Sequence, residues 1–304
     1  MAHTNRVELV PNSDWDERIL VCRNGHLVQT FIIISQRFVV LIDTAINPQT
    51  AQQLMAIAAP HLPGRSLLII NSHADYDHAW GNQLFVGPAA PYPAPIIGRQ
   101  AVAQQFADPE TATTLAQFQQ SEPAIFGDVV LTPPTLLFDS VLEIAGGDLT
   151  LKLFAAPGHT ADHTAIYIPE IETLLAGDGA ELPYPAARVP AGLPHMRQSL
   201  ANMAALQPKT ALYCHAPATI GPQLLHDNIA YFDQLESRCR VALARGLPAD
   251  LPPDPDLINL VNCPIEELFP AGEPWQSLHP YYRTAGHAEQ IRTMLHWLRE
   301  TTLT

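Results

Sequence analysis

Two imidazoles and two carboxylates crowd into six consecutive residues of this chain. They are His73, Asp75, Asp77 and His78, within the segment NSHADYDH that begins at residue 71. Side chains at alternate positions of an extended backbone share one face, so His73, Asp75 and Asp77 can converge while His78 points to a second place. This pattern predicts a segment that holds two metal ions side by side. The plain alternative is a polar loop that happens to contain two histidines.

Apolar runs that predict strands repeatedly end near a residue able to bind a metal ion. These runs are Phe38–Ile42 before Asp43, Leu67–Ile70 before the segment above, Leu149–Phe154 before His159, Thr173–Ala176 before Asp178, and Ala211–Cys214 before His215. Gly158 and Gly177 directly precede two of these side chains, and glycine lets a backbone approach a site closely. We expect Asp43 to orient a ligand or to cap a loop rather than to react itself.

This set of residues resembles the motifs of the metallo-β-lactamase superfamily. The family pattern is an HxHxDH loop, a Gly-His after a strand, an Asp in a Gly-Asp turn and a late His, and the resemblance covers residues 18–235. It implies an α/β fold, a four-layer αββα sandwich with the site at one edge between the two sheets. It also implies a metal-dependent hydrolase.

The resemblance assigns the metal ligands of a binuclear site. It implies that His73, Asp75 and His159 hold one divalent ion, that Asp77, His78 and His215 hold the other, and that Asp178 bridges them. Two cations so close repel each other, so a bridging carboxylate and a bridging hydroxide are needed to hold them. The ions lower the pKa of the bound water to roughly 7, which supplies the nucleophile, and Asp77 is the catalytic residue expected to orient it or relay its proton.

Asp75 departs from the family pattern, which has histidine at this position. A carboxylate oxygen is a harder ligand than imidazole and shifts the preference from zinc toward iron or manganese. The di-iron flavoproteins of the superfamily also have a carboxylate here, and they reduce oxygen or nitric oxide. A mononuclear or impaired site is the other consequence that Asp75 could have.

The expected reaction is attack by the metal-bridging hydroxide on an ester, thioester, lactone, amide or phosphoester of a small molecule. The alternative is a di-iron or mono-iron oxidoreductase acting on oxygen, nitric oxide or a sulfur compound. The chain has no flavodoxin-like segment and no Gly-rich phosphate loop, so an electron donor would have to come from another protein. A metal-holding scaffold without activity is the third interpretation.

The remaining histidines receive smaller roles. His163 and His195 are expected to contact substrate or line its pocket. Four others lie in helical patterns and are expected at the surface or in structural hydrogen bonds: His226, His279, His287 and His296. Cys214 is expected to be a buried neighbour of a ligand, and Tyr76 and Trp80 to form the pocket wall or anchor the loop.

Composition limits the partners. The formal net charge is −14 and the only lysines are Lys152 and Lys209, which argues against nucleic acid and anionic membranes as partners. We expect a small-molecule substrate, and a homo-oligomer is left open. Four cysteines without CxxC spacing, no apolar leader and no long apolar run predict reduced thiols and a cytoplasmic protein.

Residues 1–245 are expected to form the catalytic domain and 246–304 a helical extension, with a Pro-rich shift in composition around 246–255 between them. Within the first part, 87–128 is interpreted as an insertion that overhangs the site as an ordered lid. The pattern predicts a helix that begins at Ala79, with its N-terminal dipole orienting His78. A single helix is expected over 98–120.

Overall fold

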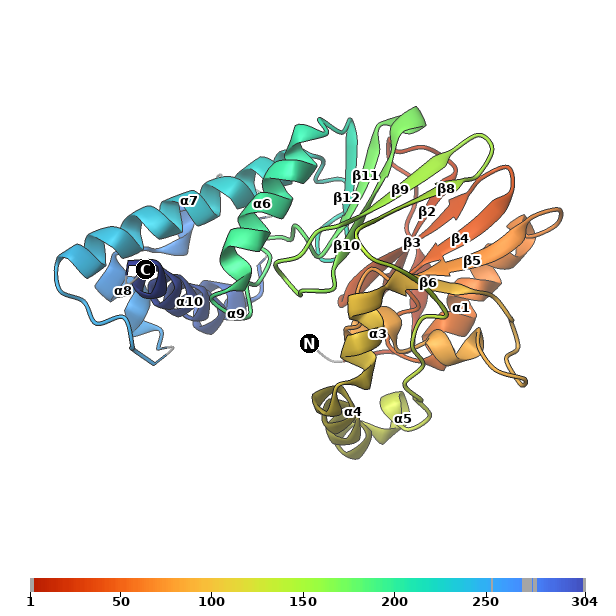
Figure 1. Cartoon of the computed structure of the whole chain (residues 1–304), viewed down its shortest axis with the longest axis horizontal. Coiled ribbons are helices and arrows are strands. Elements are labelled where there is room, and N and C mark those ends of the chain that lie inside the picture. Colours follow the sequence, from red (N-terminus) through yellow and green to blue (C-terminus); the bar gives the residue numbers. More distant parts are fainter. Residues whose placement is uncertain (1–2, 253, 270–274, 276–277, 303–304) are drawn as a thin grey trace. The chain divides into compact units, whose positions relative to one another are not determined.

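The computed structural model describes residues 3–252, 254–269, 275 and 278–302. The chain forms two compact units (Figure 1). The sheet unit consists of the residues up to Ala155 together with Asp162–Gly177 and Lys209–Thr219. The helical unit consists of Ala156–Ala161, Asp178–Pro208 and the chain from Ile220 onward.

The sheet unit contains two sheets. The first has seven strands in chain order: β1 (Val7–Leu9), β2 (Ile19–Asn24), β3 (Val28–Ile34), β4 (Phe38–Ile42), β5 (Ser66–Ile70), β6 (Ile96–Arg99) and β7 (Leu136–Phe138). Strands β1 to β4 are antiparallel, and β4 to β7 are parallel. Asn24-Gly25, a pair typical of tight hairpin turns, connects β2 to β3, and Gly25 has a φ of +57° there.

The second sheet has five strands in the order β12-β11-β10-β9-β8. Their bounds are β8 (Val141–Ala145), β9 (Thr150–Ala155), β10 (Thr164–Ile168), β11 (Thr173–Gly177) and β12 (Thr210–Tyr213). Only the β11–β12 pair is parallel. Since β11 ends at Gly177 and β12 at Tyr213, the chain beyond both strands leaves from the same edge of the sheet.

A common core joins the two sheets. Phe31 and Ile33 on β3 pack in the same cluster as Leu151, Leu153 and Ile166 of the second sheet, and all are almost fully buried. Burying one such side chain contributes roughly 1.5–3 kcal/mol. The apolar run Leu149–Phe154, expected to form a strand, is confirmed as β9 in this core.

Helix α1 (Pro48–Ala58) covers the other face of the first sheet. Leu54 and Met55 share a cluster with Ile32 of β3 and Leu41 of β4, which point away from the second sheet. The helix begins with a reciprocal cap, since the side chains of Asn47 and Thr50 bond each other's backbone N–H. Its end is followed by a 3₁₀ turn, Ala59–His61.

One expectation for the middle of the sheet unit is wrong. Residues 98–120 do not form one helix: β6 takes the start, and α3 (Gln100–Ala107) and α4 (Pro109–Ser121) follow before α5 (Pro123–Phe126). Asp108 is extended, with a ψ of +129°, because the ring of Pro109 disfavours a helical residue before it. The segment 87–128 also contributes β6 to the sheet, so it is more than an overhang; its role as a lid stays a prediction.

The helix expected from Ala79 begins earlier, within the segment 71–78. Helix α2 spans Tyr76–Ala79 and a 3₁₀ turn follows at Asn82–Leu84, so His78 lies inside α2 rather than before a helix start. The expected dipole effect on His78 is therefore wrong. Tyr76 and Trp80 pack with Phe118 and Phe126, and this aromatic cluster fixes the short helix. Burial raises the pKa of the Tyr76 phenol well above its ordinary value.

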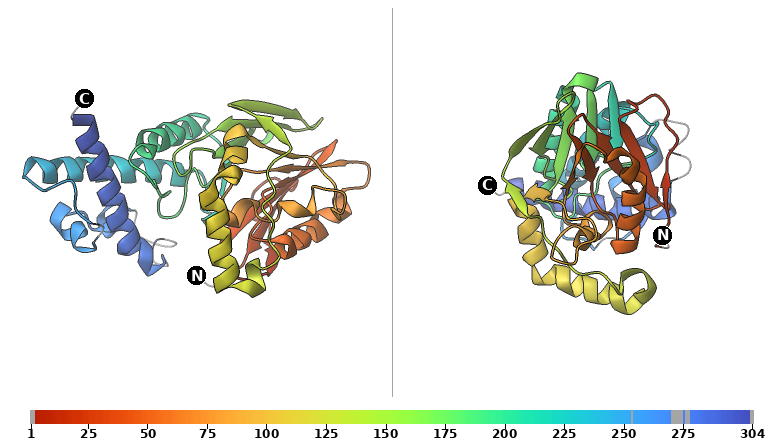
Figure 2. Two further views of the ribbon diagram at one scale, coloured as in Figure 1. Left: turned by 60° about the horizontal axis from the view of Figure 1, so that its bottom comes forward. Right: turned by 90° about the vertical axis from the view of Figure 1, so that its right-hand side faces the viewer.

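The helical unit contains α6 (Gly192–Ala205), α7 (Gln223–Ala244), α8 (Asp256–Val261), α9 (Pro280–Arg283) and α10 (Ala285–Thr302), with a 3₁₀ turn at Ile265–Glu267. Helix α7 packs against α6, and α10 packs across α7 (Figure 2). The boundary expected at residue 245 follows α7 and lies inside this unit; that division stays a prediction. Among the described helices, none combines the length and apolar character needed to cross a membrane.

His287 of α10 is a structural histidine, as expected. It is fully buried, its Nε2 lies 2.8 Å from the Cys263 carbonyl oxygen and its Nδ1 3.0 Å from Tyr231 Oη. A carbonyl only accepts, so Nε2 carries the proton and the Tyr231 hydroxyl donates to Nδ1. Burial lowers the pKa of His287.

Candidate metal centre

Asp43, directly after β4, orients two histidines of the sheet unit. Its Oδ2 lies 2.9 Å from His78 Nδ1, and its two oxygens accept from the Ser72 backbone N–H and hydroxyl, both at 2.7 Å. The Ser72 oxygen in turn lies 3.0 Å from His73 Nδ1. Asp43 has a φ of +65°, a left-handed conformation that a well-anchored Asp tolerates. The geometry matches the orienting role expected from the sequence.

Asp77, His78 and His215 form a donor group within the sheet unit. Each offers one atom, and the three atoms lie within 4.8 Å of one another. Asp77 Oδ2 is 3.7 Å from His78 Nε2 and 3.4 Å from His215 Nε2. His215 follows β12 by two residues, and its Nδ1 lies 2.7 Å from the Leu27 carbonyl oxygen.

His73 and Asp75 form a second pair at the same segment. His73 Nε2 lies 3.4 Å from Asp75 Oδ2, and the His73 ring is 4.1 Å from the His78 ring. The backbone N–H of Ala74, between them, donates to the buried carboxylate of Asp162 at 2.9 Å. The segment is thus held from both sides, by Asp43 and by Asp162.

His163 is fully buried behind this pair. Its ring lies 5.3 Å from the ring of His73, and a Cβ placed on Gly177 would be 2.7 Å from His163 Nε2. Gly177 also has a φ of +56°, so glycine is required there on two counts. A fully buried ring packs beside the ligands rather than facing solvent, and contact of His163 with substrate stays a prediction.

His159, Asp178 and Glu181 form a donor group within the helical unit, again with one atom of each inside 4.8 Å. His159 Nε2 lies 3.6 Å from Asp178 Oδ2, and Nδ1 lies 3.2 Å from Glu181 Oε1. All three side chains are buried. Asn228 on α7 holds the Glu181 backbone at both its N–H and its carbonyl, each at 3.0 Å.

The four candidate histidine ligands share one feature. In each ring Nδ1 lies within 3.2 Å of an oxygen that can accept a hydrogen bond: Ser72 Oγ for His73, Asp43 for His78, Glu181 for His159 and the Leu27 carbonyl for His215. The proton therefore belongs on Nδ1 and the lone pair on Nε2, which is the arrangement found when an outer partner orients a metal-binding imidazole.

The distances between the donor atoms also suit a metal ion. The Nε2-to-carboxylate separations within each unit are 3.4, 3.4, 3.6 and 3.7 Å, too long for good hydrogen bonds. Two ligands at about 2.1 Å from a tetrahedral ion lie about 3.4 Å apart. The buried carboxylates and imidazoles present in each unit therefore fit divalent metal ions by chemistry and by spacing.

Sequence reasoning missed Asp162, Glu181 and Arg188. Arg188, in the coil before α6, places Nη2 2.9 Å from His159 Nε2. Glu181 follows Asp178 by three residues, and this spacing was the available signal. His195 lies in α6 and is exposed; its contact with substrate stays a prediction. Cys214 is buried, as expected.

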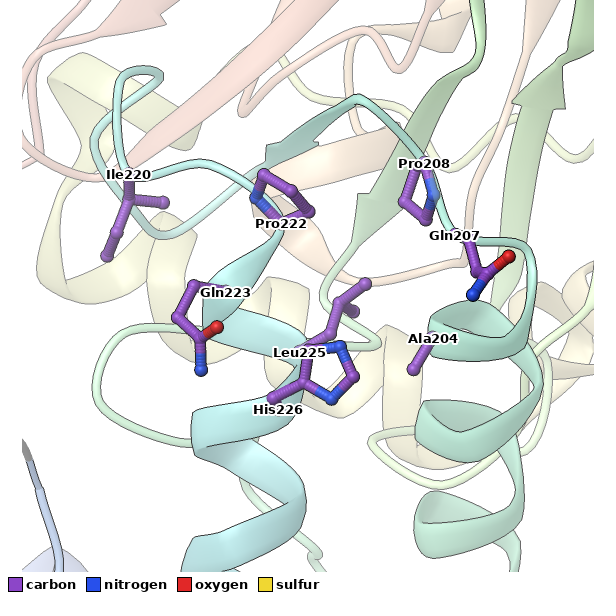
Figure 3. Close-up of a pocket in the computed structure, with 8 residues that line it drawn as sticks. All are labelled: Ala204, Gln207, Pro208, Ile220, Pro222, Gln223, Leu225 and His226. Atoms are coloured by element: carbon purple, nitrogen blue, oxygen red, sulfur yellow. The ribbon is translucent and has the colours of Figure 1, made fainter.

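A pocket in the helical unit lies where α6 ends and α7 begins (Figure 3). It has a volume of about 420 Å³ and is lined by Ala204, Gln207, Pro208, Ile220, Pro222, Gln223, Leu225 and His226. None of the predicted site residues lines it. His226 is the only titratable side chain of its lining, and the expected surface position of His226 is confirmed.

The chain belongs to the metallo-β-lactamase superfamily, whose sequence model matches residues 23–215. This confirms the family that the resemblance implies. A comparison with curated proteins finds no match.

Solved structures share the fold. A metallo-β-lactamase family protein from Thermus thermophilus is 18% identical, with a TM-score of 0.60 over 97% of this chain and 94% of that one. A metallo-β-lactamase from Pontibacter korlensis is 17% identical, with a TM-score of 0.56 over 75% and 99% of the two chains. A stereoselective inverting sec-alkylsulfatase from Pseudomonas sp. is 16% identical, with a TM-score of 0.69 over 93% of this chain and 49% of that one. The expected α/β class with two sheets and a C-terminal helical region is confirmed.

Proposed function

We propose that the protein is a metal-dependent hydrolase that cleaves an ester, thioester, lactone, amide or phosphoester of a small molecule. The observation that carries the proposal is the shared orientation of the four candidate histidines, which leaves each Nε2 lone pair beside a buried or half-buried carboxylate. Membership in a superfamily of generally metal-dependent hydrolases supports it.

The proposed ligands are those that the motifs assign: His73, Asp75, Asp77, His78, His159, Asp178 and His215. Two of the ligand-bearing segments begin at strand ends: Asp178 directly follows β11, and the segment that carries His159 directly follows β9. When bound, divalent ions at such ligands lower the pKa of water to about 7 and polarise the bond to be cleaved. Asp77 orients the attacking water and accepts its proton, while Asp43 and Glu181 keep the imidazoles in the binding tautomer.

The substrate panel follows from the proposed chemistry and from the comparisons. It contains p-nitrophenyl acetate, a thioester, a lactone and a phosphodiester. It also contains a secondary alkyl sulfate, because the sec-alkylsulfatase matches 93% of this chain. Protein purified without added metal is analysed for metal content and then assayed with zinc, manganese or iron(II). Hydrolysis that is lost with a chelator and restored by a metal supports the proposal; a metal-loaded protein inactive on the whole panel counts against it.

Asp75 favours a second candidate, an iron oxidoreductase, because its carboxylate stands 3.4 Å from His73 Nε2 where the family motif has histidine. The optical spectrum of the purified protein separates the two candidates, because a di-iron oxo centre absorbs near-ultraviolet and visible light and a zinc centre does not. The variant Asp75→His tests the hardness argument: we expect zinc occupancy to rise at the cost of iron and manganese. Unchanged metal content would remove that argument.

A further inference from the structure

Arg188 and Glu181 flank the imidazole of His159 within the helical unit. Arg188 Nη2 lies 2.9 Å from Nε2, and Glu181 Oε1 lies 3.2 Å from Nδ1. Because a guanidinium only donates, Nε2 accepts from Arg188, which leaves the ring proton on Nδ1. A cation thus lies within hydrogen-bond distance of the lone pair that we assign to metal binding.

A guanidinium N–H and a metal ion cannot share one lone pair of His159. With metal bound, the Arg188 side chain must turn away from Nε2. Arg188 is exposed and lies in the coil between β11 and α6, so its side chain can turn without breaking a helix or a strand. Only the side chain turns and the Arg188 backbone keeps its position. The guanidinium therefore stays near His159, at a distance limited by the length of the Arg188 side chain.

A guanidinium so near a divalent ion is repelled by it, so Arg188 does not help to hold the metal. Asp178 and Glu181 offset part of that repulsion. A negative group on a bound substrate would offset more, and the planar guanidinium fork matches the oxygens of a carboxylate, sulfate or phosphate.

We propose that Arg188 binds an anionic group of the substrate, so that the preferred substrates are small esters with one negative group near the bond that is cleaved. The proposal rests on the proposed function, because it takes His159 to be a metal ligand. The net charge of −14 repels polyanions at a distance, which fits recognition of a single anionic group by a single arginine.

Three p-nitrophenyl esters, which share one leaving group, test the proposal: two anionic esters are each compared with a neutral one. Mono-p-nitrophenyl glutarate and p-nitrophenyl sulfate carry a negative group, and p-nitrophenyl acetate does not. We expect Arg188→Gln to lower kcat/KM for the anionic ester that the protein cleaves by about 10–100-fold, and for the acetate by less than about twofold. Arg188→Lys should recover part of the loss. The control Arg240→Gln removes an exposed arginine of α7 that pairs with Glu236, and should change neither rate.

Calorimetric titration of the metal-loaded protein with glutarate and with sulfate supplies a measurement independent of turnover. We expect the wild type to bind one of these anions and Arg188→Gln to bind it at least about tenfold more weakly, with metal content unchanged or higher. Anion affinity that is equal in the two proteins, or absent in the wild type, overturns the proposal.

The two measurements separate this proposal from the hydrolase proposal. Hydrolysis in which Arg188→Gln slows both esters equally, or neither, overturns the role of Arg188 and leaves the hydrolase standing. Anion binding that depends on Arg188 in a metal-loaded protein that cleaves no substrate of the panel supports the role of Arg188 and counts against the hydrolase.

Discussion

Asp43 Oδ2 accepts a hydrogen bond from His78 Nδ1 at 2.9 Å and from the Ser72 hydroxyl at 2.7 Å, so one buried carboxylate orients His78 directly and His73 through Ser72. The variant Asp43→Asn keeps the shape and tolerates the left-handed backbone, but its amide can accept from fewer donors. We expect metal affinity to fall by about 10–100-fold, as is typical when the outer partner of a ligating histidine is removed. Metal titration followed by calorimetry measures it, and an unchanged affinity would refute the orienting role.

Glu181 is expected to orient His159 in the same way. Glu181→Gln should weaken metal binding by about 10–100-fold while leaving the folded structure intact, because Asn228 bonds to the Glu181 backbone and not to its side chain. The matched control is Glu266→Gln, an exposed carboxylate paired with Arg283 in the same unit. If both variants bind metal equally well, Glu181 has no part in the site.

Gly177 is expected to be more costly to replace than another glycine with positive φ. Gly64→Ala meets no atom within 4 Å, so it should cost only the left-handed backbone penalty, about 1–2 kcal/mol of the free energy of unfolding. Gly177→Ala carries the same penalty and also brings its Cβ to 2.7 Å from His163 Nε2. Urea denaturation of both variants measures the difference; a Gly177 variant no less stable than the Gly64 variant would contradict the close approach.

His287 makes the stability of the helical unit depend on pH. Burial lowers its folded pKa below the unfolded value of about 6.5, so the neutral ring is favoured by folding. Its contribution is fully present above about pH 6.5 and is lost as the pH falls toward the folded pKa. We expect the wild type to lose more unfolding free energy than His287→Gln between about pH 7.5 and 5.5. Equal losses in the two proteins would mean that His287 does not titrate in this way.

Local patterns predicted the strands and the segment that carries the donors. The apolar runs before Asp43 and Asp178 form β4 and β11. Strand β6 was missed because its four residues, Ile96–Arg99, follow a Pro-rich stretch and pair in parallel with strands distant in sequence. The break between α3 and α4 had a readable signal, an Asp before Pro109, that a continuous helical interpretation ignored.

The candidate site could be predicted only as far as its motifs extend. The residues after strands were found from residue type and spacing. Glu181 and Arg188 were not, because their contacts with His159 join positions far apart in the sequence and depend on how the coil before α6 folds. The same holds for Asp162, whose carboxylate bonds the Ala74 backbone across 88 positions. The motifs predicted the candidate ligands and Asp43, whereas the contacts of Asp162, Glu181 and Arg188 are visible only in the tertiary structure.

The central claim is that metal held by these carboxylates and imidazoles makes the protein a hydrolase, and Asp178→Asn tests it most directly. Metal content and hydrolysis of the best ester of the panel are measured together in the wild type and in this variant. We predict that the variant binds at most about half as much metal as the wild type and that its kcat is more than about 100-fold lower, because Asp178 is the proposed bridging ligand. A variant that retains wild-type metal content and full activity would contradict the assignment.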